Sequence, residues 1–323
     1  MERRTTKTRI ITEKKGSNNK NLYREEGNEN MKHLAEKKES QHMKYTGVNY
    51  TGGKRKAAVQ RALVLSAAAV TLGMLLFLIA YILIKGIPHL KPSLFALQYT
   101  SDNVSMFPAI VNTVIMTLLS LLIAIPFGIS TAIYLTEYAK RGNKLVEAIR
   151  LTAETLAGIP SIVYGLFGLL FFVTYLGMGY SILAGSATLS IMILPLIMRT
   201  SEEALKSVPD SYREASFGLG AGKLRTVAKI VLPAAVPGIL VGVILAVGRI
   251  IGETAALLYT AGTVAKLPAD LFSSARTLSV HMYLLSSEGF NTDEAYATAV
   301  VLLLVVLSIN TLSAAIAKKV TKV

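Results

Sequence analysis

The sequence predicts an all-α membrane protein in which six helices cross the bilayer. The first observation is that a polar part, residues 1–61, precedes a remainder far more apolar than a soluble domain. The whole chain of 323 residues therefore reaches 52% apolar residues and a mean hydropathy of +0.49. The second observation is that apolar stretches of about 20 residues recur in this remainder, which is the length a helix needs to span a hydrocarbon core of about 30 Å.

The strongly basic composition does not indicate a nucleic-acid partner. A net charge of +14 is compatible with nucleic-acid binding. The basic residues, however, lie in the N-terminal tail and at the ends of apolar segments, where positive charge marks the cytoplasmic side. The chain contains no cysteine, which excludes disulfides and thiolate ligands, and we expect no metal site.

Residues 1–61 are expected to form a disordered cytoplasmic tail. They are rich in Lys, Glu, Asn, Gly and Thr and contain too few large apolar side chains to bury a core. No apolar run precedes Gln60, so no cleavable signal peptide is expected. The basic residues 54–56 and Arg61 would favour anionic membrane lipids. The simplest interpretation of the tail is a solvated, dispensable extension.

Six apolar segments follow, and we take residues 62–317 as one transmembrane domain and residues 318–323 as a cytoplasmic C-terminus. The predicted crossings are residues 62–84, 109–135, 156–177, 182–198, 234–259 and 295–316. The first is uncharged, and the third is opened by Gly158-Ile159-Pro160. Pro126, Pro195 and Pro237 interrupt the second, fourth and fifth, which is tolerated where neighbouring helices satisfy the freed backbone groups. These breaks indicate a packed bundle around a pathway.

The distribution of basic residues predicts the orientation. Lys and Arg are concentrated before the first segment, between the second and third, between the fourth and fifth, and after the sixth, whereas the other loops are poorer in them. Because short loops rich in Lys and Arg stay in the cytoplasm, both termini are expected to be cytoplasmic.

The loop between the fourth and fifth segments contains a predicted helix at about residues 211–220. Ser211 and Glu214 have the spacing of a capping box, and a helix would run from Tyr212 to Leu219. One face would carry Tyr212, Ala215, Ser216 and Leu219. Such a short amphipathic element can occupy a groove on a partner, although an ordinary amphipathic loop helix would show the same pattern.

This loop resembles a motif of the transmembrane subunits of ABC importers. The family pattern is Glu-Ala-Ala, three residues, Gly, nine residues, Ile-x-Leu-Pro. The chain has Glu214-Ala215-Ser216, then Gly220, then Ile230-Val231-Leu232-Pro233 at the same spacing. Ser216 in place of the second Ala is the one departure. The resemblance implies that the segment is a coupling helix seated in a separate ATPase subunit, with coupling residues Tyr212, Glu214, Ala215, Ser216, Leu219 and Gly220.

A glycine-rich run, Gly218 to Leu224, superficially resembles a phosphate-binding loop. A P-loop requires Gly where Phe217 stands and Ser or Thr where Leu224 stands. The chain is therefore expected to bind no cofactor and to be no enzyme by itself, with ATP and Mg²⁺ bound on the partner ATPase.

Two charged residues, Arg249 and Glu253, lie within the fifth segment. Their four-residue spacing predicts that they share a helix face. Charges at this depth are costly unless they pair or meet water, so they should face the bundle interior. Arg249 presents a donor fork suited to oxyanions, Glu253 could neutralise it, and Thr254 could add a hydroxyl. The alternative is a structural ion pair. Arg199, at the end of the fourth segment, could aid anion exit or act only as a cytoplasmic anchor.

Further motifs resemble the permeases of ABC phosphate importers. These are the segments 249–255 (Arg-x-x-Gly-Glu-Thr-Ala), 199–205, 158–162 and 276–283. The resemblance covers about residues 62–317 and is closer to the second of the two permeases that such importers pair. It implies a heterodimer with a sister permease, an ATPase dimer and an extracytoplasmic phosphate-binding protein.

Two other functions stay open at the level of sequence. An ABC permease for another oxyanion, such as sulfate or molybdate, or for an unrelated solute would share most of these features. An intramembrane enzyme or a sensor is the other class, but the four His residues are scattered and no His-Glu-x-x-His motif exists.

Overall fold

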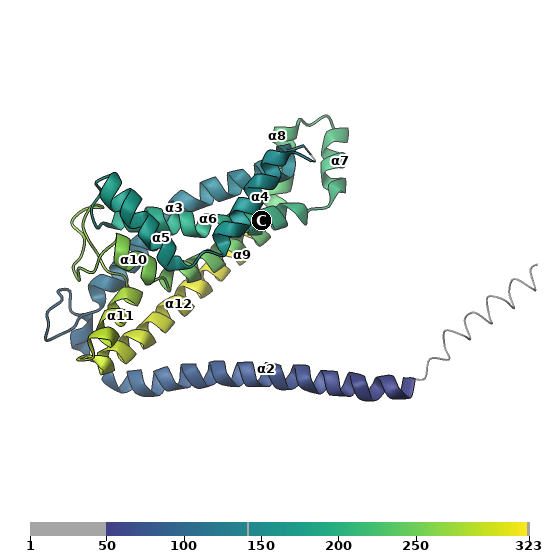
Figure 1. Cartoon of the computed structure of the whole chain (residues 1–323). Helices are drawn as coiled ribbons and strands as arrows, with labels where there is room; N and C mark the ends of the chain where they lie inside the picture. The colour runs from purple at the N-terminus through teal and green to yellow at the C-terminus, as the bar shows by residue number, and fades with distance from the viewer. Residues whose placement is uncertain (1–49, 141, 322–323) are drawn as a thin grey trace, which may run out of the picture. The chain divides into compact units, whose positions relative to one another are not determined.

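The computed structural model describes residues 50–140 and 142–321, and every regular element within them is helical (Figure 1). The α-helices are α2 (Tyr50–Gly86), α3 (Phe107–Ile133), α4 (Lys144–Ala157), α5 (Ser161–Gly168), α6 (Ile182–Lys206), α7 (Asp210–Gly218), α8 (Lys223–Thr226), α9 (Leu232–Ile251), α10 (Ala255–Thr260), α11 (Leu278–Glu288) and α12 (Thr292–Thr321). Three π-helical segments extend them: η3 (Tyr134–Tyr138), η4 (Leu169–Tyr175) and η5 (Val227–Val231). Two 3₁₀ turns, η1 (Ile87–His89) and η2 (Pro92–Phe95), follow α2.

The chain divides into two units, residues 1–76 and residues 77–323, which we describe separately. In the first unit, the side chains of residues 57–76 are all exposed along one continuous apolar helix, as expected of a helix that meets lipid. The expected disorder of residues 1–49 lies outside the described residues. The predicted end of the tail at Arg61 was wrong, because α2 already begins at Tyr50.

Five helical stretches are long and apolar enough to cross a membrane: Ala57–His89, Phe107–Tyr138, Ile182–Lys206, Lys223–Ile251 and Thr292–Lys319. A bent pair, Lys144–Ala157 and Ser161–Tyr175, brings the number to six if it is one span. The predicted first, second, fourth and sixth segments all fall within these stretches. The chain therefore has the length and composition for five or six crossings.

The third predicted segment has a different start. Leu156 and Ala157 end α4, and the chain turns by 103° before α5 begins at Ser161. The turn lies at Gly158-Ile159-Pro160, where proline disfavours the helical conformation of the residue before it. The motif that predicted a kink within one helix therefore forms a sharp turn between two helices, α4 and α5.

The fifth predicted segment is not one helix. Helix α9 ends at Ile251, and a new helix, α10, begins at Ala255. The carboxylate Oε1 of Glu253 accepts a hydrogen bond from the Ala256 backbone N–H at 3.1 Å. The prediction of a continuous helix to Tyr259 was wrong because this acidic side chain satisfies a free amide at the start of α10.

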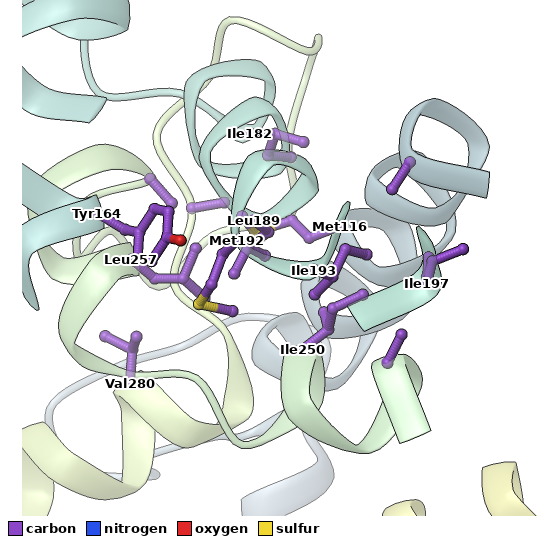
Figure 2. Close-up of a cluster of buried hydrophobic side chains, with 14 residues drawn as sticks. Met116, Tyr164, Ile182, Leu189, Met192, Ile193, Ile197, Ile250, Leu257 and Val280 are labelled. Carbon is purple, nitrogen blue, oxygen red and sulfur yellow. The ribbon is translucent and has the colours of Figure 1, made fainter. Parts of the chain in front are cut away.

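Helix α6 is the centre of the second unit (Figure 2). Its apolar side chains Leu189, Met192 and Ile193 pack against residues contributed by α3, α5, α9, α10 and α11. These partners are Met116, Tyr164, Ile250, Leu257 and Val280. Five helices therefore share one apolar core built around α6.

Buried hydroxyls fix α3 against α6. Ser120 Oγ donates to the Ser186 carbonyl at 3.2 Å, and Ser190 Oγ donates to the Ser120 carbonyl at 3.1 Å. Lipid offers no hydrophobic driving force between helices, so close packing and such interhelical hydrogen bonds determine how they associate. These two bonds set the relative height of α3 and α6.

The contact between α5 and α10 requires glycine at position 165. A Cβ atom there would lie 2.8 Å from Ala256 Cα and 3.3 Å from the Ala255 carbonyl oxygen. Both obstacles are backbone atoms, which cannot rotate away. We therefore predict that Gly165→Ala lowers the stability of the chain in detergent by about 1–3 kcal/mol, the usual cost of overpacking, as a lower midpoint of thermal unfolding.

The matched control is Gly73→Ala, because a Cβ atom at Gly73 meets no atom within 4 Å. This control should unfold at the same temperature as the original chain or slightly above it, since alanine favours helix. An unchanged midpoint for Gly165→Ala would show that α5 and α10 are not in close contact.

Candidate coupling and translocation site

The predicted coupling helix exists, but its start is different. Helix α7 runs from Asp210 to Gly218, and Pro209 occupies the N-cap without a side-chain hydrogen bond. No hydrogen bond joins Ser211 and Glu214 in the described part of the chain, so the predicted capping box was wrong. The fixed φ of Pro209 starts the helix earlier than Ser211, and Asp210 supplies the acidic residue of the first turn.

Three of the predicted coupling residues face away from the chain. Tyr212 is 52% exposed and Leu219 is 90% exposed, and Ala215 between them is also exposed. These three residues line a hollow of about 520 Å³ with Gly220 and with basic residues of the following segment, Arg225 and Lys229. An apolar surface with basic neighbours is therefore open to a partner.

Ser216 lines the same hollow, although its side chain is buried. Its hydroxyl shares a hydrogen bond of 2.8 Å with Thr226 Oγ1 on α8. Its predicted contact with a partner stays a prediction. The hydroxyl that distinguishes this chain from the Glu-Ala-Ala pattern thus joins α7 to α8.

The turn after α7 depends on Gly220, whose φ of +81° is rare for residues with a Cβ atom. Its N–H donates to the Phe217 carbonyl at 2.9 Å. Glu214 is exposed and has no ion pair or side-chain hydrogen bond within residues 50–140 and 142–321. Its carboxylate is therefore available to a partner at the surface of α7.

Arg213 anchors α7 to the transmembrane helices. Its guanidinium binds the Glu137 carboxylate at the end of α3, with 2.7 Å between Nη2 and Oε1 and 3.1 Å between Nε and Oε1. It also donates to the carbonyls of Val208 at 2.8 Å and Leu205 at 3.0 Å. The hydrogen bond to Glu137 is the largest cause that raises the pKa of Arg213 above its ordinary value. Glu137 was not predicted as a partner of this segment, since nothing local in the sequence links it to α7.

A second group of charges joins α4 to α6. The buried Glu202 carboxylate pairs with Arg150 and with Lys206, each at 2.7 Å. Arg199 Nη2 lies 3.9 Å from Glu154 Oε1, at a side chain that is 46% exposed. Arg199 is therefore next to α4. Its predicted role in anion exit stays a prediction.

Arg249 and Glu253 do not form the expected pair. Because α9 ends between them, they do not share a helix face, and no ion pair joins them in the part of the chain that the structure describes. Glu253 is nearly buried, with its carboxylate bound to the Ala256 amide and its carbonyl accepting from Ser279 Oγ at 2.6 Å. Glu253 therefore has a structural role in joining α9, α10 and α11.

Arg249 instead lies on an exposed stripe of α9. The exposed residues Val241, Leu245, Arg249 and Gly252 recur at intervals of three or four positions, which places them on one face. Arg249 is close enough to Tyr164 on α5 to interact with it electrostatically. Within the described residues it has no ion pair or side-chain hydrogen bond. Within the second unit, no described helix covers this stripe.

Thr254 lies at the break between α9 and α10. It lines a cavity of about 600 Å³ with Tyr259, Tyr283 and Tyr296, among mainly apolar neighbours. Thr254, whose hydroxyl was predicted to lie beside Arg249, is close to Arg249 in the sequence and lines this cavity.

Known proteins resemble the chain over most of its length. The family described as "Binding-protein-dependent transport system inner membrane component" matches residues 124–322. "Probable ABC transporter permease protein YqgI" of Bacillus subtilis is 36% identical over 75% of this chain and 88% of its own length. "Phosphate transport system permease protein PstA" of Yersinia pestis is 36% identical over 80% and 89% of the two chains.

Solved structures share the fold. A chain of a bacterial alginate ABC transporter superposes with a TM-score of 0.62 at 18% identity, covering 85% of this chain and 98% of the other. A chain of the MetNI methionine ABC transporter gives a TM-score of 0.53 at 22% identity, covering 67% and 94%. These identities support the fold alone. The family match and the curated relatives show that the chain belongs to the binding-protein-dependent transport system inner membrane components, the multi-pass permease subunits of ABC importers.

Proposed function

We propose that this chain is a permease subunit of an ATP-driven importer of inorganic phosphate. The observation that carries the proposal is Arg249, an exposed guanidinium without a counter-charge among the described residues, in a helix long and apolar enough to cross the membrane. Relatives named phosphate transport system permease PstA, 34% and 36% identical to the chain, support phosphate as the anion.

The position of Arg249 fits a translocation pathway better than a lipid-facing surface. An unpaired charge in hydrocarbon costs several kcal/mol. The same face of α9 would lie in a polar environment if a sister permease covered it and enclosed a water-filled pathway between the two subunits. Arg249 could then bind an oxyanion through its planar donor fork. In this proposal the two permeases form a heterodimer, and the exposed face of α9 that carries Arg249 lines the pathway between them.

The coupling helix α7 indicates where an ATPase subunit would act on the permease. The exposed residues of α7 and the hollow beside them form a surface suited to a separate ATPase subunit, which would bind ATP and Mg²⁺. With two permeases, two ATPase subunits would be needed, and an extracytoplasmic phosphate-binding protein would deliver the substrate. In this arrangement α7 and both chain termini are cytoplasmic, in agreement with the distribution of basic residues.

The contact between Arg213 and Glu137 gives a route for the motion. Closure of the ATPase dimer would displace α7, and the ion pair would transmit this displacement to α3. Helix α3 packs against α6 through buried hydroxyls, so the core would move with it as a rigid body. Alternating access would then follow from ATP binding and hydrolysis.

The first test replaces the unpaired guanidinium. We predict that Arg249→Ala abolishes ATP-driven phosphate uptake by proteoliposomes containing the whole importer, while the complex still assembles. Arg249→Lys keeps the charge but not the fork and should retain less than about a tenth of the uptake.

Uptake of labelled phosphate is measured with sulfate and molybdate as competitors. Normal uptake by Arg249→Ala would remove this residue from the pathway. Stronger competition by sulfate or molybdate than by phosphate itself would favour an importer of that oxyanion.

The second test fills the exposed face of the coupling helix. We predict that Ala215→Trp releases the ATPase subunit, or prevents the permease from stimulating its hydrolysis, because the indole would occupy the docking surface. The control, Phe217→Trp, changes an exposed residue on another face of α7 and should leave both properties intact. The docking assignment fails if the ATPase co-purifies with the Ala215→Trp variant and is stimulated normally.

The third test measures how much the ion pair between Arg213 and Glu137 contributes to stability and coupling. Arg213→Gln leaves the buried Glu137 carboxylate without its ion-pair partner, which should lower stability by about 3–5 kcal/mol. Glu137→Gln should cost less, because Arg213 keeps its ion pair with the exposed Asp210 carboxylate. The double variant should be more stable than the sum of the two single losses implies. The control is Asp210→Asn, which removes a carboxylate whose side chain is 84% exposed, where loss of an ion pair costs about 1 kcal/mol or less.

Thermal unfolding in detergent gives the stabilities, and phosphate uptake per ATP hydrolysed gives the coupling. We expect the double variant to hydrolyse ATP with reduced transport. Full coupling in the double variant would contradict the proposed route through this ion pair.

A further inference from the structure

Arg276 is a second guanidinium without a counter-charge, and it is buried. It is 5% exposed and lies directly before α11. No salt bridge involves it in the described part of the chain, and its Nε and Nη2 atoms have no hydrogen-bond partner there. A buried charge that lacks a partner is strongly unfavourable. Arg276 therefore requires a negative group that residues 50–140 and 142–321 do not supply.

The carboxylates of this region form no salt bridge with Arg276 within the described residues, and this includes Asp102, which is exposed. Asp293 pairs with His89, and Glu294 pairs with Lys91. Asp270 accepts hydrogen bonds from the Phe272 amide and the Ser273 hydroxyl. None of these acidic groups is within salt-bridge distance of Arg276, so the missing negative charge is not one of them.

The orientation of the guanidinium leaves its bidentate edge free. Its flat face is covered by the ring of Tyr99, with 4.5 Å between the guanidinium carbon and the ring centroid. The two unpartnered atoms, Nε and Nη2, form the edge with two parallel N–H groups. This edge is the one that binds carboxylate or phosphate oxygens in pairs.

Polar atoms without partners surround the same position. The ring of His281 contacts Tyr99, with 6.1 Å between the ring centroids, and it interacts with the Val104 backbone. Burial and the charge of Arg276 lower the pKa of His281 to about 3. The ring is therefore neutral, and with its N–H directed to Val104 it offers one acceptor nitrogen.

Asn112 on α3 adds a second acceptor. Its Nδ2 donates to the carbonyls of Arg276 and Lys266, each at 3.2 Å, which fixes the orientation of the amide. Its Oδ1 is buried without a partner among the described residues. The surroundings of Arg276 thus combine a charged donor fork with neutral acceptors.

We propose that Arg276, with Asn112 and His281, forms an outer binding site for a protonated tetrahedral oxyanion of the phosphate class. Phosphate at neutral pH carries both acceptor oxygens for the fork and a P–OH group that can donate to Asn112 Oδ1 or to an imidazole nitrogen. Sulfate has no proton to donate and would leave these acceptors unpaired. The site therefore selects phosphate over sulfate.

The site lies far from the coupling helix and close to the break after α9. Figure 1 shows α7 and α11 at opposite ends of the second unit. Asn112 is near the start of α3 and Glu137 lies just beyond its end, in η3, so about 37 Å of helix at ~1.5 Å per residue separates them. Thr277 and Ser279 share a hydrogen bond of 3.0 Å, and Ser279 binds the Glu253 carbonyl. An anion leaving Arg276 would therefore be near Arg249. This inference rests on the proposed import of phosphate, with Arg276 preceding Arg249.

The test measures binding of labelled inorganic phosphate to the full-length chain in detergent. Arg249→Gln removes the other guanidinium, so that only the outer site is observed. We expect this variant to bind phosphate, with sulfate at least tenfold weaker as a competitor. Adding Arg276→Met should weaken binding at least tenfold, and Arg276→Lys should also weaken it, because lysine lacks the fork.

Stability separates loss of binding from loss of folding. Without phosphate, Arg276→Met should melt no lower than its parent, since it removes an uncompensated charge, and phosphate should raise the melting temperature only when Arg276 is present. Equal binding with and without Arg276 would overturn the proposal. An Arg249→Gln variant that binds no phosphate would also overturn it, because Arg276 would then hold no anion by itself. The proposed function fails separately, if the complete importer takes up no phosphate.

Discussion

A guanidinium that leaves bulk water needs a negative partner. By this criterion three arginines of the chain, Arg213, Arg249 and Arg276, have different roles. Arg213 has the buried Glu137 carboxylate and the exposed Asp210 carboxylate, and is a structural anchor. Arg249 and Arg276 have none among the described residues; one is exposed on a membrane helix, and the other is buried beside Tyr99. Because the cost of an uncompensated charge is high in both environments, the absence of a partner in the part of the chain that the structure describes points to a ligand, and the fork geometry points to an oxyanion.

Helix α3 connects the two ends of this arrangement. Near its start, Asn112 and Thr113 hold the segment before α11, through hydrogen bonds to the Arg276 carbonyl and from the Leu278 amide. Just beyond its end, Glu137 holds the coupling helix. Between them, buried serines and close apolar contacts join α3 to α6. A displacement of α7 would therefore reach the outer segment through one continuous helix, without any unfolding.

The sequence predicts the parts of this architecture that depend on local pattern. Apolar length gives four of the crossings, and the spacing from Glu214 to Pro233 gives the coupling helix. It does not predict the break at Gly252, because the carboxylate of Glu253 starts α10 only when the surrounding helices bury it. It also misses contacts between distant residues: Ser216 with Thr226, Arg213 with Glu137, and Arg276 with Tyr99. Such pairs depend on tertiary packing, which no periodicity encodes.

The most direct measurement asks whether the stripe of α9 lies in water. The chain contains no cysteine, so Leu245→Cys, one turn from Arg249, gives a single thiol whose reaction with a water-soluble reagent can be followed in the assembled importer. Leu122→Cys on α3, at a side chain that is 71% exposed, is the lipid-facing control. The account predicts that the thiol at position 245 reacts faster than the thiol at 122 and that phosphate slows its reaction. Equal, negligible reactivity of both thiols would place this face of α9 in lipid and contradict a pathway at Arg249.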